Sequence, residues 1–446
     1  MVAYAPMPAR VLITGVSCVS PFGIGPQPFV EALLSGTSGI APITLFDTST
    51  CASHQAAAIR GFDPAAFIAP LKLRRIDAVG RLALGCARLL VDDAELVVGS
   101  NGRDDIGVAL GTYTAGLDSV VEYLRGLTRD GPTGVPALIF SNTVSNAPAS
   151  LCAIEFGLRG PNVTLNQREA SSLAALAYAV DLIKDEHAAA MVAGGTDRLE
   201  ETFFKVHDRF GALSPMKRFA RNGGAGTGEL GVSGVPSKPR PLNAVASNVE
   251  AARPFDCRRN GFVFGEGGFM LLLESASAAE RRRSRVYGEI LGAGLTASST
   301  PLNRWPADGS GLARAMRLAL DDAGVDPEKI AAVFAAGNGS PQLDRFEAAA
   351  VTEVFHDRRV PVASLRGAAG ECSAAGAASV VAGLFTIARR VLPPTTGFSV
   401  PDPGCRLSVY AHPQTVDGDT FMVNSVGAGG TNCSVVVRAL GGVEHV

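Results

Sequence analysis

Residues 160–173 read GPNVTLNQREASSL and carry two structural signals in succession. The apolar and β-branched side chains before Asn166 are typical of a short strand. Beyond the bend, apolar side chains recur at the spacing of one helix face, at Leu173, Leu176, Val180 and Ile183. We therefore predict a strand, a sharp bend and an amphipathic helix, with Glu169 exposed at the bend.

Strand-like runs and helical patterns alternate along the rest of the chain, which predicts a parallel sheet covered by helices. The expected strands are residues 11–15, 106–111, 163–166, 190–194, 269–274, 286–292, 332–335 and 434–438. Helical patterns such as residues 75–92 and 311–322 lie between them. The chain has 446 residues and 47% hydrophobic content, more than one domain usually holds, so we expect two domains or two fused halves.

Charge and cysteine usage exclude several classes of partner. The net charge of −2 argues against nucleic acid and against an anionic membrane. The eight cysteines are scattered without a Cys-x-x-Cys pair, and no His-Glu-x-x-His motif occurs, so we expect no metal site. We expect no signal peptide, and no apolar run of the sequence is long enough to span a bilayer. The cysteines are therefore expected to be reduced thiols in the cytoplasm.

Residues 218–252 break the α/β pattern with a glycine-rich and proline-bearing run. Within it, residues 226–231 read GTGELG and match the Gly-x-Gly-x-x-Gly pattern of dinucleotide sites by letter. A dinucleotide site requires a strand before this pattern and a helix after it, and neither is found here. We predict a flexible surface insertion and no cofactor.

Four blocks of the sequence resemble β-ketoacyl synthases. Residues 160–173 are similar to the nucleophile loop of that family, in which Gly-Pro opens the strand and a cysteine precedes a small-residue helix. The other blocks are RVLITG at residues 10–15, RPFD followed by GFV and GEG within residues 253–267, and the glycine loop NSVGAGGTN at residues 424–432. The resemblance implies a thiolase-like five-layer αβαβα fold with two pseudo-duplicated halves, which we place at residues 1–275 and 276–446.

The same resemblance marks the positions at which this chain lacks the residues that condense. A synthase of this family uses a cysteine, two histidines and a supporting lysine. By register, Glu169 stands at the cysteine, Ala336 at the first histidine, Arg366 at the lysine and Glu371 at the second histidine. Ala428 replaces the gating phenylalanine of the last loop. Condensation needs a thiolate and neutral imidazoles, so we expect no catalytic residue for it in this chain. Glu169, as an anion, would be favoured at the helix N-terminus.

One branch of the family is similar in this respect, the chain length factors, or ketosynthase β-subunits, of type II polyketide synthases. They lack the cysteine and commonly carry Gln followed by Ala, where this chain has Glu169 and Ala170. This resemblance implies a heterodimer with a catalytic ketosynthase, access to an acyl carrier protein through that complex, and control of polyketide or polyene chain length. The implied residues of the acyl pocket or interface are Thr114, Ile139, Phe140, Thr143, Glu169 and Ala428.

Two alternatives remain open. The chain could be a decarboxylase or hydrolase in which Glu169 is the general base and Arg366 the oxyanion partner, since buried carboxylates act as bases. It could also be a purely structural homodimer, which the intact elbow and glycine loops disfavour. Glu169 is expected to contact Arg168 or a residue of a partner.

Overall fold

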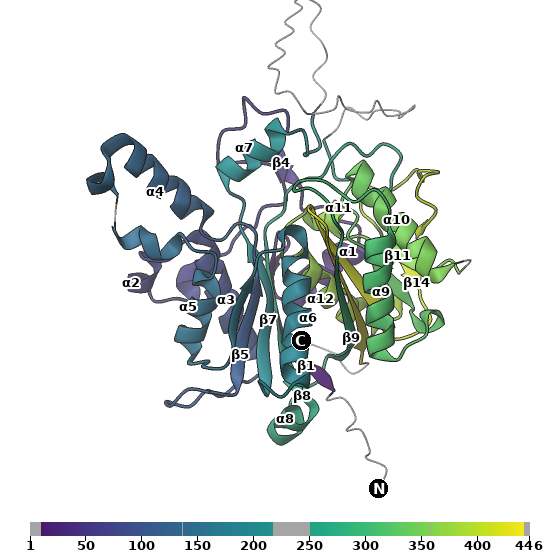
Figure 1. Cartoon of the computed structure of the whole chain (residues 1–446), viewed down its shortest axis with the longest axis horizontal. Coiled ribbons are helices and arrows are strands. Elements are labelled where there is room, and N and C mark those ends of the chain that lie inside the picture. Colours follow the sequence, from purple (N-terminus) through teal and green to yellow (C-terminus); the bar gives the residue numbers. More distant parts are fainter. Residues whose placement is uncertain (1–9, 136, 217–249, 357, 441–446) are drawn as a thin grey trace, which may run out of the picture.

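The computed structural model describes residues 10–135, 137–216, 250–356 and 358–440. Five layers of helices and strands can be followed across the molecule in Figure 1. Most of the expected insertion at residues 218–252, including the glycine pattern at 226–231, lies outside the described residues. Within the described part of the chain, no helix combines the length and the apolar character needed to cross a membrane.

The two halves of the chain contribute five main strands each, in the same spatial order. From its outer edge, the first half gives β6 (Asn162–Leu165), β5 (Ile106–Gly111), β7 (Ala190–Asp197), β8 (Gly267–Ser275) and β1 (Val11–Ser20). The second half gives β11 (Pro361–Ala363), β10 (Ala332–Phe334), β15 (Thr420–Gly427), β16 (Thr431–Ala439) and β9 (Gly288–Ala297), with β13 (Ser408–Val409) beyond β11. In both halves the first three strands pair with one another in parallel. The fourth strand pairs antiparallel with both the third and the fifth. The repeated order is the expected pseudo-duplication, and β1 pairs with β9 where the halves meet.

Helices fill the space between the two half-sheets and cover their outer faces (Figure 1). The central layer holds α1 (Pro26–Leu34), α6 (Ser171–Lys184) and α12 (Ala375–Ile387). The outer layers are α3 (Ala78–Asp93) with α5 (Ala147–Phe156), and α9 (Ser310–Ala323) with α10 (Pro341–Phe355). All residues of α12 are buried and α6 is buried on most sides, because small side chains let a helix pack between two sheets. The helix after the bend, α6, was predicted to be amphipathic. It lies instead in the central layer and is buried on most of its sides.

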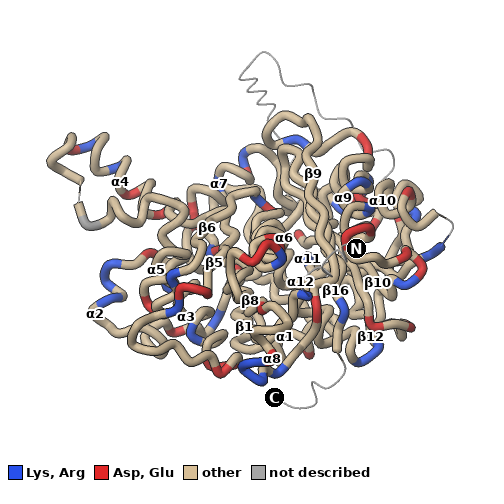
Figure 2. Tube along the Cα trace, turned by 60° about the horizontal axis from the view of Figure 1, so that its bottom comes forward, with Lys and Arg blue, Asp and Glu red and all other residues tan. Residues whose placement is uncertain are grey.

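The remaining helices and strands lie outside these layers. The helices are α2 (Pro70–Leu73), α4 (Leu117–Asp130), α7 (Glu201–Arg209), α8 (Ala276–Arg282) and α11 (Arg366–Ala369). The strands are β2 (Gly23–Ile24), β3 (Ala41–Pro42), β4 (Gln55–Ala56), β12 (Val391–Leu392) and β14 (Gln414–Thr415). Figure 2 shows acidic and basic residues interspersed along the tube rather than separated by sign.

The eight expected strands are all present, but the prediction of a parallel sheet was wrong because the sheet is mixed. A parallel pair needs a long crossover connection, and β15 is joined to β16 by only Ala428, Gly429 and Gly430. The expected glycine loop at residues 424–432 is therefore mostly hairpin strand. The division of the chain at residue 275, where β8 ends, stays a prediction.

Candidate functional site

A tight bend connects β6 to α6. Arg168 has a left-handed backbone conformation with φ of 55°, which turns the chain through the short helix η4 (Arg168–Ala170). Ser171 Oγ accepts a hydrogen bond from the Gln167 N–H at 2.9 Å and donates one to the Arg168 carbonyl at 2.6 Å. Gly111 of β5 lies against this bend, where a Cβ would come within 2.3 Å of the Ser171 backbone. Glycine is thus required for the strand and the helix to approach this closely.

Glu169 is buried at the bend, so the prediction that it is exposed was wrong. Its side chain turns toward the β15–β16 hairpin, where one carboxylate oxygen accepts the Ala428 N–H at 3.0 Å. The Glu169 carbonyl accepts a hydrogen bond from Ser425 Oγ at 2.9 Å. Burial raises the pKa of Glu169, although the Ala428 N–H and the charge of Arg168 oppose that rise. Desolvation therefore outweighs the helix N-terminus, which we had expected to favour the anion.

We predicted a contact of Glu169 with Arg168 or with a partner residue. Among the described residues, the guanidinium of Arg168 makes no hydrogen bond or ion pair with Glu169. It lies over the ring of Tyr113, with 5.6 Å between the guanidinium carbon and the ring centroid. One of its nitrogens donates to the side chain of Asn303. Arg168 therefore links the bend to the loop between β9 and α9.

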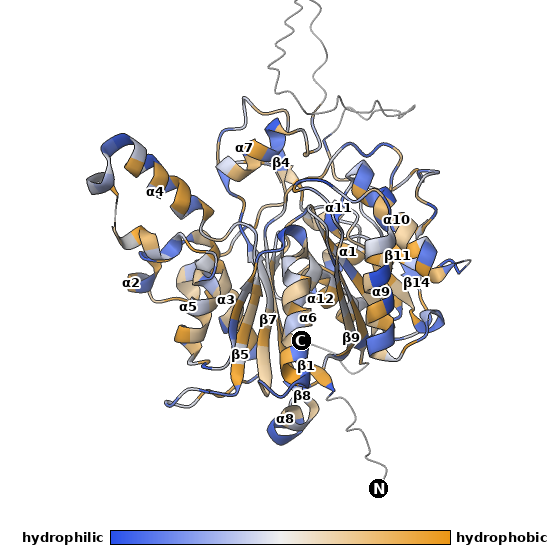
Figure 3. Cartoon of the chain, viewed as in Figure 1, coloured by the Kyte–Doolittle hydropathy of each residue, from blue (hydrophilic) through white to orange (hydrophobic). Residues whose placement is uncertain are grey.

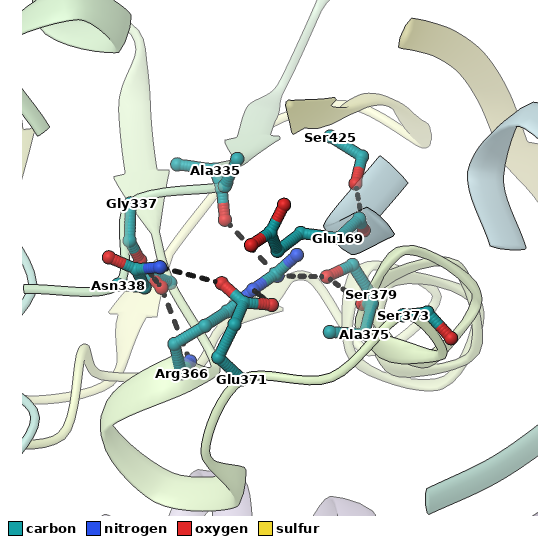
Figure 4. A network of polar contacts seen from close by, with 12 residues as sticks. Glu169, Ala335, Gly337, Asn338, Arg366, Glu371, Ser373, Ala375, Ser379 and Ser425 are labelled. Carbon is teal, nitrogen blue, oxygen red and sulfur yellow. Dashed lines mark hydrogen bonds and ion pairs between the residues drawn. The ribbon is translucent and has the colours of Figure 1, made fainter. Parts of the chain in front are cut away.

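Arg366 and Glu371 form a buried charge pair beside Glu169 (Figure 4). Arg366 Nη1 donates to the Ala335 carbonyl at 3.2 Å and to Ser379 Oγ at 2.9 Å. Its Nε lies 3.7 Å from Glu371 Oε1, while Glu371 Oε2 accepts a hydrogen bond from Asn338 at 2.9 Å. Burial raises the pKa of Glu371 to about 7; Arg366 opposes this rise and Glu169 adds to it.

The loop that carries Ala336 is held by two buried carboxylates. Glu347 of α10 accepts the N–H of Ala336 at 2.9 Å and that of Gly337 at 2.7 Å. Asp344, one turn earlier, accepts the Asn338 N–H at 3.1 Å. Two buried carboxylates thus replace water for backbone groups that would otherwise be unpaired.

Sequence reasoning missed Asp197, which organises the opposite wall of the site. One of its carboxylate oxygens accepts hydrogen bonds from the Tyr113 N–H at 2.8 Å and from the N–H and Oγ1 of Thr114 at 3.0 Å each. The other accepts the Ser373 N–H at 2.8 Å, from the second half of the chain. Its position at the C-terminal end of a buried strand is a signal that could have identified it. Sequence reasoning also gave no role to Asn338, whose side chain donates a hydrogen bond to Glu371.

The cavity at this site is very small. It has a volume of about 10 Å³, room for roughly one water molecule. Aromatic rings close it from one side: the rings of Tyr113 and Phe203 are 4.6 Å apart, and those of Phe203 and Phe264 are 5.3 Å apart. The ring of His207 packs against that of Phe203 in a tilted arrangement, with 4.3 Å between the centroids, and burial lowers the pKa of His207. An acyl chain has no space in the cavity as it stands.

Most of the predicted site residues meet here. Glu169, Glu371 and Thr114 line the cavity, and Ala428 and Arg366 contact the lining residues Glu169 and Glu371. Ala336 follows Ala335, whose carbonyl accepts a hydrogen bond from Arg366. Three predicted residues do not line the cavity. They lie on or just after the short helix η3 (Ala137–Asn142) and are Ile139, Phe140 and Thr143. Phe140 is 61% exposed and packs on Tyr123 of α4, with 5.9 Å between the ring centroids. Helix α4 projects from the body in Figure 1, and its mixed apolar and polar residues are visible in Figure 3.

The chemistry open to this arrangement is limited. The cavity is lined by three carboxylates, those of Glu169, Asp197 and Glu371, and by the thiol of Cys372, whose pKa burial raises far above its ordinary value. Such a thiol is a poor nucleophile. Among the described residues, no group of three acidic, histidine or cysteine side chains could hold a metal ion. What remains is proton transfer between a carboxyl group and one water.

Two family models match the chain: "Beta-ketoacyl synthase, N-terminal domain" over residues 9–230 and "Beta-ketoacyl synthase, C-terminal domain" over residues 287–399. A 3-oxoacyl-[acyl-carrier-protein] synthase 2 of Coxiella burnetii is 31% identical, covering 96% of this chain and 98% of that protein. The protein of the same name from Synechocystis is 29% identical, with coverage of 96% and 98%.

Two solved structures are also similar. The ishigamide ketosynthase/chain length factor has a TM-score of 0.83 and 28% identity, covering 98% of this chain and 100% of that one. The second is a ketosynthase in complex with a type II PKS acyl-carrier protein and bound to the hexaketide. It has a TM-score of 0.81 and 25% identity, with coverage of 97% and 100%.

Proposed function

This chain belongs to the β-ketoacyl synthase family, and we propose that within it the chain is a non-condensing subunit, a chain length factor. In this role it pairs with a catalytic ketosynthase and shapes the acyl tunnel that sets polyketide or polyene chain length. An acyl carrier protein delivers its chain to the complex. The proposal places the chain in the cytoplasm, where its thiols would stay reduced.

The observation that carries the proposal is the hydrogen bond from the Ala428 N–H to the Glu169 carboxylate at 3.0 Å. Acyl transfer requires backbone N–H groups that are free to bind the oxyanion. Here an internal carboxylate takes that donor, next to a cavity of about 10 Å³. A site with no thiolate, no imidazole and an occupied donor favours an enclosing role over a condensing one.

The comparisons support the family membership more strongly than the non-condensing role. The curated relatives are named as synthases, which supports the family but not the loss of activity. The ishigamide structure contains a chain length factor, and the second structure contains a type II carrier protein. The residues at four positions favour a chain length factor over a synthase. They are Glu169, Ala336, Arg366 and Glu371.

An unpaired sheet edge supports the heterodimer. β6 lies at the end of the sheet. The carbonyl of Leu165, its last residue, and that of Pro161, just before it, accept hydrogen bonds from the side of β5. By alternation, the backbone N–H of Thr164 points away from β5, into the open edge. Thr164 Oγ1 is buried and has no hydrogen-bond partner among the described residues. A strand from a partner would satisfy such an edge.

Exposed apolar side chains also occur on α4, η3, α5 and the link between η3 and α5. They are Leu124 (51% exposed), Leu127 (37%), Phe140 (61%), Val144 (47%) and Ile154 (79%). We propose that a ketosynthase subunit covers them, and that Ile139, Phe140, Thr143 and Thr114 contribute to the tunnel wall. The division into halves at residues 1–275 and 276–446 belongs to the same proposal.

Co-expression with a ketosynthase that retains its cysteine tests the pairing. The two chains should co-elute in one-to-one ratio on size exclusion, and the elongation activity should depend on both. Thr164→Pro removes the outward N–H without removing a bond to β5, so it should abolish co-elution. Thr164→Ala keeps that N–H and should still co-elute. Co-elution of the proline variant would argue against the edge, and no pairing with any such synthase would argue against the proposal.

A second function is favoured by one observation, the Glu371 pKa of about 7 beside a cavity with room for one water. A carboxyl group with that pKa can act as a general acid or base near neutral pH. The reaction would be decarboxylation or hydrolysis, as expected for an enzyme that uses Glu169. Release of carbon dioxide from a malonyl carrier protein by the chain alone, lost in Glu169→Ala, would support it.

A further inference from the structure

A second, larger cavity lies on the outer side of the loop at residues 298–309. It has a volume of about 580 Å³, which falls within the range of roughly 300–1,000 Å³ that small-molecule sites occupy. This groove is formed by the loop between β9 and α9 together with the first turns of α10. It shares no lining residue with the cavity at Glu169.

One wall of the groove is a single face of α10. Gln342, Arg345, Phe346 and Ala349 line it at helical spacing. Phe346 is 3% exposed, and half-buried Trp305 of the loop packs against the same hydrophobic cluster. The groove therefore has an aromatic floor anchored in the core between α9 and α10.

The loop that forms the other wall is held in place. The Arg304 carbonyl accepts a hydrogen bond from the Gly429 N–H at 3.0 Å. At its far end, Gly309 lies so close to α10 that a Cβ would come within 2.5 Å of the Ala350 nitrogen. Asn303, directly before Arg304, accepts the hydrogen bond from Arg168 described above. The wall is thus preformed, which lowers the entropic cost of binding.

The charges in the groove favour an anion. Arg304 makes no side-chain hydrogen bond or ion pair with the residues that the structure describes. Arg345 reaches only Asp402, at 3.6 Å, and that carboxylate already pairs with Arg259 at 2.6 Å. Asp308 is the only acidic residue lining the groove, and it accepts hydrogen bonds from the N–H and Oγ of Ser310. Two guanidinium groups are therefore available beside an aromatic surface.

We propose that this groove binds a small organic anion with a flat apolar body. Arg304 and Arg345 hold its carboxylate or phosphate head, because a guanidinium forms paired, charge-assisted hydrogen bonds with either group. The body lies against Trp305 and Phe346, whose rings favour stacking with an unsaturated or aromatic group. The inference does not depend on the function proposed above.

Trp305 is the only tryptophan of the sequence, so intrinsic fluorescence reports on this groove. Titration with 3-phenylpropionate should change the emission saturably, with the affinity confirmed by calorimetry. Neutral 3-phenylpropionamide has the same ring and should not bind. Phenyl phosphate distinguishes the two heads, since tighter binding of either anion identifies the preferred one. The proposal would be overturned if the neutral amide bound as tightly as the anions, or if neither anion bound.

Substitutions locate the bound anion. Arg304→Gln and Arg345→Gln should each weaken 3-phenylpropionate roughly tenfold, as expected for the loss of a charge-assisted hydrogen bond. Arg314→Gln, on the exposed surface of α9 and outside the groove, should leave the affinity unchanged. All three side chains are at the surface, so melting temperatures should stay at that of the natural chain. Unchanged affinity in both groove variants would contradict this assignment.

Discussion

The carboxylate of Glu169 accepts a hydrogen bond from the backbone N–H of Ala428, 259 positions further along the chain. The two residues come from the two halves of the fold, one from the strand-to-helix bend and the other from the β15–β16 hairpin. The contact both closes the site and connects the halves. Several measurable consequences follow from it and from its neighbours.

Restoring the nucleophile alone should not restore condensation. In Glu169→Cys, a thiol would replace the carboxylate, but Ala336 and Glu371 would still supply no imidazole for the enolate and oxyanion. We expect no detectable condensation of an acyl carrier substrate with a malonyl carrier protein, measured by mass spectrometry of the products. A variant that also carries Ala336→His and Glu371→His is the comparison. Condensation by the single variant would show that the family's imidazoles are dispensable here.

Removal of the buried guanidinium should destabilise the chain through Glu371. Arg366→Met should lower the free energy of unfolding by about 3 kcal/mol, because it leaves a buried carboxylate unpaired. Adding Glu371→Gln should recover part of that loss, and urea unfolding of the four-member cycle measures the coupling. Arg317→Met removes an exposed ion pair with Glu353 and should cost less than about 1 kcal/mol. Strictly additive effects of the two site variants would mean that Arg366 and Glu371 are not coupled.

Glu371 should make stability depend on pH. Burial raises its pKa in the folded chain from the ordinary 4.5 to about 7, so the folded state binds this proton more tightly. The resulting stabilisation is complete below pH 4.5 and is lost as the pH rises toward 7. Glu371→Gln lacks this dependence, so it should gain stability relative to the natural chain between pH 5 and pH 8 in urea unfolding. Glu353→Gln is the surface control; the same gain there would remove the assignment to Glu371.

Phe140 should limit product length if it lines the tunnel of the complex. Phe140→Ala removes an exposed ring from η3, and we expect the reconstituted pair to make a longer polyketide, detected by mass spectrometry. Phe210→Ala removes another exposed ring, 76% accessible, just after α7, and should leave the product unchanged. An unchanged product in Phe140→Ala, with pairing intact, would exclude this residue from the wall.

Much of the site could be predicted from sequence because its residues lie in local motifs. Glu169 follows a strand and precedes a helix, and Arg366 and Glu371 lie within one short segment, so register alone identified them. Asn338 and Asp197 were missed because their roles come from partners in other segments. Asp197 is the clearest case, since it joins backbone groups near Thr114 to that of Ser373.

The amino-acid sequence alone determined the alternation of strands and helices and the residue types at positions 169, 336, 366 and 371, because periodicity and residue identity are local properties. Only the tertiary structure decided that the sheet is mixed, that Glu169 is buried and that Ala428 is its partner. Those features depend on how distant segments pack and on which backbone groups burial leaves to be satisfied. The groove beside Trp305 has the same origin, since α10 and the loop before α9 form it only when folded together.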